Sequence, residues 1–442
     1  MKIIRIIARL NVGGPSRHVV WLTAGLQSPM CESMLVAGVV PPGEDDMSYF
    51  AAKNGVVPLI IPQMSREISP KDVLTIWKLY RLFVRECPDI IHTHTAKAGT
   101  VGRTAGLLYR WLTLGLLVGR PRRCRLVHTY HGHIFHSYYG ALKTRIFLGI
   151  EKALARLATD RIITISRQQY REIHEKFDVG DDEQFVVIPL GLDTTIFADS
   201  LNRRSLMRDE LGMNKTDMLI GIVGRLTEVK NHALFLKTIA YYKETFGTVK
   251  DGRRVRFVVI GDGHLRDQLQ TQARELGIEE DLMFLGTRED PENFYPALDI
   301  VALTSLNEGT PLTLIEAMAN ARCVIATAVG GVVDLLGEDV SSPDGLEDAG
   351  YSLGERGVLV HHNDPATFCS GLARLVEDET LRDEMGERGR RFISQNYSKD
   401  RLLADVLKLY HELTREKQAV ESKAQNPKSE VGNESTTLDI GH

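Results

Sequence analysis

The sequence has few cysteines, no long apolar run and little net charge, and each shortage excludes a class of protein. Its five cysteines are scattered without a Cys-x-x-Cys spacing. This pattern indicates reduced thiols in a cytoplasmic setting and argues against a structural zinc site. The longest apolar candidate, 111–118, is far shorter than the roughly 18 residues of a membrane-spanning helix, so we expect no such segment. A net charge of −4 gives no global reason to expect nucleic acid as a partner.

Length and composition indicate a folded protein with more than one hydrophobic core. A chain of 442 residues is long for a single core and favours two domains of similar size. Apolar and charged residues make up 43% and 25% of the chain, which is ordinary for folded soluble proteins and excludes disorder of the whole chain. The apolar start of the chain is interrupted by Arg5 and Arg9 and is too short for the core of a signal peptide, so we interpret it as a buried first strand.

Short runs of β-branched residues alternate with helical patterns along most of the chain. This alternation is typical of parallel sheets with crossover helices, so the predicted fold class is α/β with two doubly wound parallel sheets. We predict strands at 2–8, 33–39, 56–61, 89–93, 126–130, 161–166 and 185–190 in the first half and at 218–223, 255–260, 299–304 and 323–327 in the second.

A polar and basic segment at 198–217 interrupts this rhythm and marks a domain boundary. An amphipathic pattern near the end predicts a closing helix, and the polar residues after it predict disorder. The predicted organisation is an N-terminal domain at 1–197, a C-terminal domain at 198–395, a closing helix at 396–416 that returns toward the N-terminal domain, and a disordered tail at 417–442.

The loops that follow the predicted strands have special compositions. They include LNVGGPSRH after the first strand, HTYHGHIF after 126–130, GRLTEVKN after 218–223 and SLNEGTPL after 299–304. Ligands of open parallel sheets bind beyond the carboxyl ends of the strands. Two facing sheets would therefore bring both sets of loops toward one cleft.

Two of these loops suit a phosphate ligand. Arg225 provides a bidentate fork and Lys230 a point charge, a combination that fits a diphosphate; for this loop in isolation, two solvated surface charges are the simpler explanation. Gly13 and Gly14 precede a predicted helix, where glycine lets the backbone approach a ligand and the first N–H groups attract anions. No G-x-G-x-x-G fingerprint is present, and a plain tight turn is the alternative.

The stretch NEGTPLTLIEAMAN at 307–320 places two glutamates around a helix start. We predict Thr310 as the N-cap and Pro311 as the first residue of an apolar, buried helix. Glu316 lies inside that helix, where a carboxylate is costly unless it is paired or hydrogen-bonded. It could accept from both hydroxyls of a ribose, or form a buried ion pair with an arginine. Glu308 precedes the helix, and we expect it to be accessible.

These residues resemble a known family. The Glu308-x7-Glu316 spacing resembles the Glu-x7-Glu motif of family 4 glycosyltransferases, which have the two-domain GT-B fold. The Gly224-Arg225-Leu226-x3-Lys230 loop is similar to their phosphate-binding loop, and further similar segments follow in the expected order over residues 1–415. The resemblance implies a retaining enzyme with an acceptor-binding N-terminal domain and a C-terminal domain that binds a nucleotide sugar, of which a UDP-sugar is the favoured class. It also implies a cell-surface glycan or a lipid-linked molecule as the acceptor, and no bound metal.

The resemblance also assigns roles to residues. Glu316 would hold the ribose, Glu308 would contact the donor sugar, and the departing phosphate would itself take the proton of the attacking hydroxyl. The implied catalytic residues are His131, Arg225, Lys230 and Glu308. The implied donor-binding residues are Gly13, Gly14, Arg225, Lys230, Thr287, Arg288, Glu308, Gly309, Thr310, Pro311, Leu312 and Glu316.

Several histidines follow predicted strands and raise the question of a metal site. They are His92, His94, His128, His131, His133 and His136. Histidine ligands normally come with Asp, Glu or Cys partners, and no carboxylate cluster accompanies these residues, so we expect no metal.

A basic region lies apart from the predicted cleft. Residues 90–150 contain no Asp or Glu, and the segment 103–125 is apolar and then basic. It suits an interfacial helix that contacts anionic lipid, which would place the protein on the inner face of a membrane. A surface helix followed by a solvated basic loop is the alternative. For the whole protein, the alternatives are a sugar-nucleotide 2-epimerase of the same architecture and a non-catalytic partner in glycan assembly.

Overall fold

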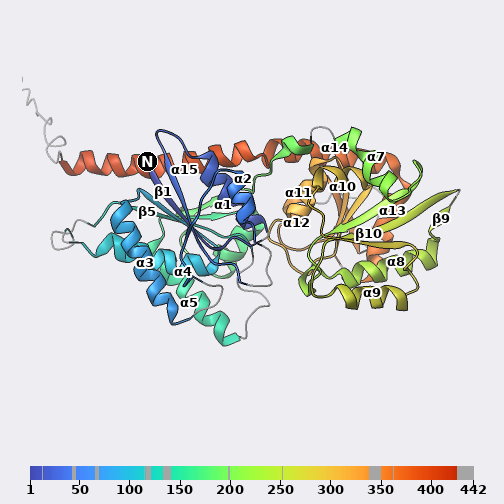
Figure 1. Cartoon of the computed structure of the whole chain (residues 1–442), viewed down its shortest axis with the longest axis horizontal. Coiled ribbons are helices and arrows are strands. Elements are labelled where there is room, and N and C mark those ends of the chain that lie inside the picture. The colour runs from blue at the N-terminus through green and yellow to red at the C-terminus, as the bar shows by residue number, and fades with distance from the viewer. Residues whose placement is uncertain are drawn as a thin grey trace, which may run out of the picture.

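The computed structural model describes two α/β lobes that are joined near the middle of the chain (Figure 1). It describes residues 1–11, 13–41, 46–64, 69–113, 115, 121–132, 141–197, 200–250, 252–337, 350–361 and 363–425.

The N-terminal lobe is built on a sheet of seven described strands, all parallel, in the order β3-β2-β1-β4-β5-β6-β7. The strands are β1 Lys2–Arg9, β2 Glu32–Gly38, β3 Leu59–Ile60, β4 Ile90–His94, β5 Arg125–Thr129, β6 Arg161–Thr164 and β7 Phe185–Val187. The larger helices are α1 Gly14–Gly25, α2 Ser48–Lys53, α3 Lys71–Glu86, α4 Ala96–Trp111 and α5 Ala141–Ala158, followed by α6 Arg167–Tyr170 and a π-helical turn at Arg171–Lys176.

Both faces of this sheet are covered, which explains its continuous apolar strands. On β1, Ile4 and Ile6 pack against α3 and α4, whereas Ile3 and Ile7 point to the opposite face, because successive side chains of a strand alternate. That opposite face is covered by α1 and by the last helix of the chain (Figure 1).

The C-terminal lobe has a second sheet, in the order β11-β10-β8-β12-β13-β15-β14, with β9 paired to β10. Its strands are β8 Met218–Val223, β9 Val249–Lys250, β10 Arg253–Ile260, β11 Leu282–Gly286, β12 Ile300–Leu303, β13 Cys323–Thr327, β14 Tyr351–Gly354 and β15 Gly357–Val360. Its helices are α7 Ser200–Glu210, α8 His232–Phe246, α9 Arg266–Glu275, α10 Pro291–Ala297, α11 Leu312–Ala319, α12 Val332–Leu336, α13 Pro365–Glu377 and α14 Glu379–Asn396. The core on one face includes α8, α9 and α13, and the core on the other includes α10, α11, α12 and α14.

Every predicted strand overlaps a strand of the structure, but the predicted set omitted strands at or next to the edges of the second sheet. The omitted strands are β9, β11, β14 and β15. Strands β9 and β14 are short and antiparallel to their neighbours, so they break the alternation of strand and crossover helix on which the prediction depended. The predicted strand 56–61 is reduced to two exposed edge residues, Leu59–Ile60.

The last helix, α15 (Lys399–Gln425), crosses back from the C-terminal lobe to the N-terminal lobe (Figure 1). Its residues Leu402, Val406 and Leu409 are buried against β1, β4 and α1. The prediction of disorder from residue 417 is wrong for 417–425, which are helical. The sequence EKQAVESKAQ contains no glycine or proline and mostly strong helix formers, so nothing ends the helix at 416. Residues 426–442 lie outside the described part of the chain.

The described part of the basic segment 103–125 is partly buried, so not all of its cations are available to a membrane. Arg103 is fully buried in an ion pair with Glu151. Arg110 and Arg125 both pair with Asp160, so these cations serve the interior of the lobe. Residues 114 and 116–120 lie outside the described residues. Within the described part of the chain, no helix is both long enough and apolar enough to span a bilayer.

The five cysteines at 31, 87, 124, 323 and 369 are all unpaired in the structure, and only Cys87 is exposed.

Candidate functional site

A cavity of about 560 Å³ lies between the two lobes and is lined by loops from both. The strand-end loops of the two sheets therefore converge, as the pattern of their compositions predicted. The predicted site residues that line this cavity are Gly13, Gly14, His131, Arg225, Lys230, Glu308, Gly309, Thr310, Pro311, Leu312 and Glu316.

Glycines fix the two loops that the C-terminal lobe contributes. A Cβ atom on Gly261 would lie 2.0 Å from the carbonyl oxygen of Gly224, and one on Gly331 would lie 2.0 Å from that of Gly309. The N–H of Gly331 donates to the same oxygen of Gly309 at 2.7 Å. Because these backbones touch, the loop that carries Arg225 and the loop that carries Glu308 are held against neighbouring loops.

Lys230 and Glu308 form an ion pair inside the cavity. Lys230 Nζ lies 2.5 Å from Glu308 Oε1, and the hydroxyl of Ser305 donates to the same oxygen at 2.6 Å. The side chain of Glu308 is only 11% exposed, so the expectation of an accessible loop acid is wrong. The loop folds back over the lysine because a carboxylate and an ammonium group at this depth satisfy each other. Arg225, by contrast, is exposed, and no side-chain hydrogen bond or ion pair joins it to another described residue.

Glu316 has two partners in the structure. Arg17 Nη1 lies 3.0 Å from Glu316 Oε1, and the hydroxyl of Tyr295 donates to Oε2 at 2.9 Å. Burial raises the pKa of Tyr295 well above its usual value, so this phenol remains a donor. The arginine pair that sequence reasoning left open as an alternative is therefore present, and its partner comes from the opposite lobe.

Sequence reasoning identified neither Arg17 nor Tyr295, although both line the cavity. The available signal for Arg17 was its position three residues after Gly14, in the first turn of a helix that faces the cleft. For Tyr295 the available signal was its hydroxyl group alone, because a buried hydroxyl normally has a hydrogen-bond partner.

The start of helix α11 differs from the prediction by one residue. Pro311 has an extended ψ of 113° and is the N-cap, so the first helical residue is Leu312. Thr310 does not cap the helix, and its buried hydroxyl has no hydrogen-bond partner among the described residues. Without a side-chain cap, the first N–H groups of α11 remain available at the cavity.

The lobes touch at glycines. A Cβ on Gly14 would lie 2.9 Å from Leu312 Cδ1, and one on Gly309 would lie 3.1 Å from the carbonyl oxygen of His131. Both contacts cross the cleft, so the glycine loop of the N-terminal lobe lies directly against the start of α11.

Thr287 and Arg288 are the predicted donor-binding residues that do not line this cavity. The guanidinium of Arg288 is bound by Asp290, at 2.8 Å and 2.9 Å, and by Glu210 at 2.9 Å. These two acids account for the charge of Arg288 without a nucleotide, and the predicted contact with the base gains no support.

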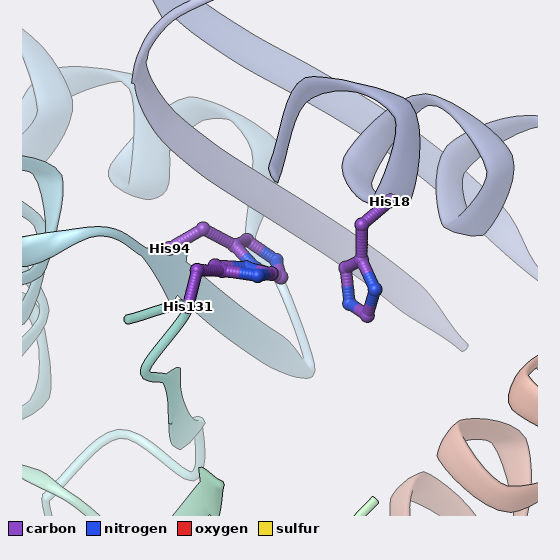
Figure 2. A group of neighbouring side chains, drawn as sticks. All are labelled: His18, His94 and His131. Carbon is purple, nitrogen blue, oxygen red and sulfur yellow. The ribbon is translucent and has the colours of Figure 1, made fainter. Parts of the chain in front are cut away.

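Three histidines cluster beside the cavity, on α1, β4 and the loop after β5 (Figure 2). His94 Nδ1 and His131 Nε2 lie 3.0 Å apart and form a hydrogen bond, while the ring of His18 lies edge-on to that of His131. Burial lowers the pKa of His131 to about 3 and the pKa of His18 and His94 well below 6.5, so all three are neutral near pH 7.

This cluster could be considered as a metal site, because one nitrogen from each ring lies within 4.8 Å of the others. However, His94 and His131 each direct one nitrogen at the other, and no carboxylate or thiolate joins the described cluster. Two of the other predicted histidines are held by hydrogen bonds to core residues. His92 bonds to Tyr410 and Thr129, and His128 bonds to Thr93, so both are core residues. His133 and His136 lie outside the described residues.

Comparison with known proteins identifies both halves of the chain. Residues 12–196 match the model of Glycosyltransferase Family 4, and residues 203–392 match the model of Glycosyl transferases group 1. The chain is 30% identical over 330 residues to the UDP-Gal:alpha-D-GlcNAc-diphosphoundecaprenol alpha-1,3-galactosyltransferase of Escherichia coli, covering 74% of this chain and 77% of that protein. It is 29% identical over 342 residues to the D-inositol 3-phosphate glycosyltransferase of Salinispora arenicola (strain CNS-205), covering 73% of this chain and 68% of that protein.

The arrangement of the two lobes is also known from solved structures. The crystal structure of Anabaena Alr3699/HepE in complex with UDP matches with a TM-score of 0.71 at 18% identity, covering 93% of this chain and 100% of that chain. This likeness confirms the predicted GT-B fold, and the sequence relatives confirm the predicted class of enzyme. The chain belongs to glycosyltransferase family 4 and is a glycosyltransferase.

Proposed function

We propose that this glycosyltransferase takes a sugar from a UDP-sugar and transfers it, with retention of the anomeric configuration, to a lipid-linked diphosphate sugar. The observation that carries the proposal is the cavity in which Gly13 and Gly14 of one lobe face Arg225 and Lys230 of the other. Backbone N–H groups at a helix start and a guanidinium–ammonium pair are complementary to a diphosphate. The Escherichia coli relative, whose name includes a UDP-sugar and a lipid-linked diphosphate, supports the two substrate classes.

The residues of the cavity supply charge stabilisation and positioning. Arg225 and Lys230 neutralise the diphosphate as its bond to the sugar breaks, which is the step where negative charge develops. Glu316 accepts from the ribose hydroxyls, and Glu308 accepts from the donor sugar. His131 lies beside the transferred sugar as a neutral group, because its pKa of about 3 prevents it from being an acid near pH 7.

We further propose that the reaction needs no metal ion, because protein cations provide the positive charge. Turnover should be unchanged after treatment with EDTA and removal of the chelator. A loss of activity that zinc or magnesium restores would contradict this proposal and would direct attention to His18, His94 and His131.

A donor and acceptor screen tests the main proposal. Each of several UDP-sugars is incubated with a short-chain polyprenyl-diphosphate sugar, and the release of UDP and the glycosylated lipid are measured together. Proton NMR of the product gives its anomeric configuration. We expect a product with the configuration of the donor, and we expect the free sugar without its lipid diphosphate to be a poor acceptor. Isomerised UDP-sugar without transfer would instead identify an epimerase, a reading that the transferase relatives do not favour.

We propose peripheral attachment to an anionic membrane through the outer face of α3 and the end of α4, which pack side by side (Figure 1). On α3, Val73 and Trp77 are 72% and 50% exposed, and the guanidinium of Arg81 lies 4.9 Å from the centre of the Trp77 ring. At the end of α4, Trp111 and Leu112 are also exposed. Exposed tryptophans beside basic groups suit a lipid interface.

Co-sedimentation with vesicles that contain anionic lipid tests this surface. We expect the wild-type protein to sediment and the Trp77→Glu variant to remain in the supernatant. Tyr241→Glu is the matched control, because Tyr241 is 42% exposed on α8 of the other lobe and should not affect sedimentation. Equal sedimentation of all three proteins, or of none, would exclude a role for α3.

A further inference from the structure

Arg17 joins the two lobes across the donor cavity. It lies in the first turn of α1, directly after the glycine loop, and its guanidinium is 3.0 Å from Glu316 on α11. The arginine side chain is 35% exposed and the glutamate only 11%, so the cavity side of the pair is open to a ligand. The contact therefore occupies the carboxylate oxygen that, under the proposed function, a ribose would use.

The charges of the cavity form two pairs and one remaining cation. Lys230 is paired with Glu308, and Arg17 is paired with Glu316. Of the described cations that line the cavity, Arg225 has no acidic partner. A nucleoside diphosphate carries more than one negative charge, so Arg225 alone cannot neutralise it.

We propose that Arg17 is a third diphosphate-binding cation, and that it leaves Glu316 for the diphosphate when a nucleotide binds. The hydroxyls of the ribose replace Arg17 as donors to the Glu316 carboxylate, while the hydroxyl of Tyr295 keeps its bond to the other oxygen. The amides of Gly13 and Gly14 line the same cavity as Arg17 and Glu316, so Arg17 can turn from the glutamate toward a diphosphate without leaving that cavity. The exchange replaces one charge pair by another, so neither charged group is left buried without a partner.

This exchange rests on the proposed function and predicts opposite effects on two ligands. Uridine has the ribose but no phosphate, so it must displace Arg17 from Glu316 without forming a new contact with the arginine. UDP displaces Arg17 and then binds it. In the Arg17→Met variant, uridine should therefore bind about two- to fivefold more tightly, since the competing ion pair is worth little at a partly exposed site. UDP should bind about tenfold more weakly, since a charge-assisted hydrogen bond is lost.

The measurement is a titration of the full-length protein with uridine and with UDP, followed by NMR or calorimetry. Arg225→Met is the matched variant, because Arg225 has no carboxylate partner among the described residues. This variant should lower the affinity for UDP and leave the affinity for uridine unchanged. Arg17→Lys keeps the positive charge but not the bidentate guanidinium, and it should recover part of the affinity for UDP. Such a recovery would also show that the loss in Arg17→Met does not result from misfolding.

Two outcomes would overturn the role of Arg17. If Arg17→Met lowers the affinity for uridine as well as for UDP, the arginine holds Glu316 in place and does not leave it when a nucleotide binds. If neither affinity changes, the pair is a surface contact without a function in binding. Wild-type protein that binds no nucleoside diphosphate would instead overturn the proposed function itself, so the two failures are distinguishable.

Discussion

Gly309→Ala tests whether the observed contact between the lobes is the catalytically competent one. The added Cβ would lie 3.1 Å from both the Cα of Gly132 and the carbonyl oxygen of His131, which belong to the opposite lobe. This separation is a few tenths of an ångström shorter than ordinary van der Waals contact. Gly309 is not among the residues with positive φ, so alanine fits its backbone and the C-terminal lobe should fold normally.

The strain therefore falls on the contact between the lobes. Overpacking of this kind costs about 1–3 kcal/mol, and separating the lobes relieves it. Because a misplacement of this size can cost an order of magnitude in rate, we expect kcat to fall about tenfold. The melting temperature should change little, because neither core is disturbed.

Gly132→Ala is the matched control for this experiment, since a Cβ at position 132 meets no heavy atom of the described residues within 4 Å. Initial rates of UDP release would be compared for the wild-type protein and the two variants, together with their affinities for UDP. Equal rates for the two alanine variants would refute the reasoning, since only Gly309→Ala crowds the opposite lobe.

Three further changes have outcomes that follow from the geometry. Tyr295→Phe removes the donor to Glu316 Oε2 and should lower the free energy of unfolding by about 1–3 kcal/mol in a urea titration, because a buried acceptor loses its partner; an unchanged value would mean that water replaces the hydroxyl. Lys230→Met should reduce kcat by about 10²–10³-fold while circular dichroism shows an intact fold, and near-normal turnover would remove Lys230 from the mechanism. Acid should destabilise the protein through its buried histidines, whose folded-state pKa lies below the ordinary 6.5, so that the unfolded state binds more protons as the pH falls. Between pH 7.5 and 5.5 each should cost up to about 1.4 kcal/mol of unfolding free energy, and a flat stability across this range would show that their pKa values are the same in the folded and unfolded states. These residues are His18, His92, His94, His128 and His131.

The sequence predicted the sheets well because their signal is local. Each central strand is a short apolar run with a helix on either side, and burial on both faces of the sheet requires that pattern. Strands β14 and β15 were missed because they form an antiparallel hairpin around Glu355 and Arg356, with no crossover helix between them. Their residues therefore did not stand out from a loop.

The sequence predicted the site residues that can be recognised within a single loop. The glycine loop, Arg225, Lys230 and both glutamates were found from loop composition and from the resemblance, and they do line one cavity. The partners of those residues were not found, because they depend on how the lobes meet. Arg17 lies 299 residues from Glu316 along the chain, and neither segment contains a sequence pattern that indicates this contact.

Two of the contacts between the lobes across the cleft are made at glycines. Gly14 lies against the side chain of Leu312, and Gly309 lies against the backbone of His131 and Gly132. Backbone and glycine contacts leave little room for a larger side chain, so both glycines hold the two lobes close together at these points. The groups that we expect to move when a diphosphate binds are the charged side chains of the cavity. Because Lys230 and Arg17 each hold a carboxylate across a single hydrogen bond, exchanging those two bonds is enough to turn a cavity of paired charges into one with three cations available to a diphosphate.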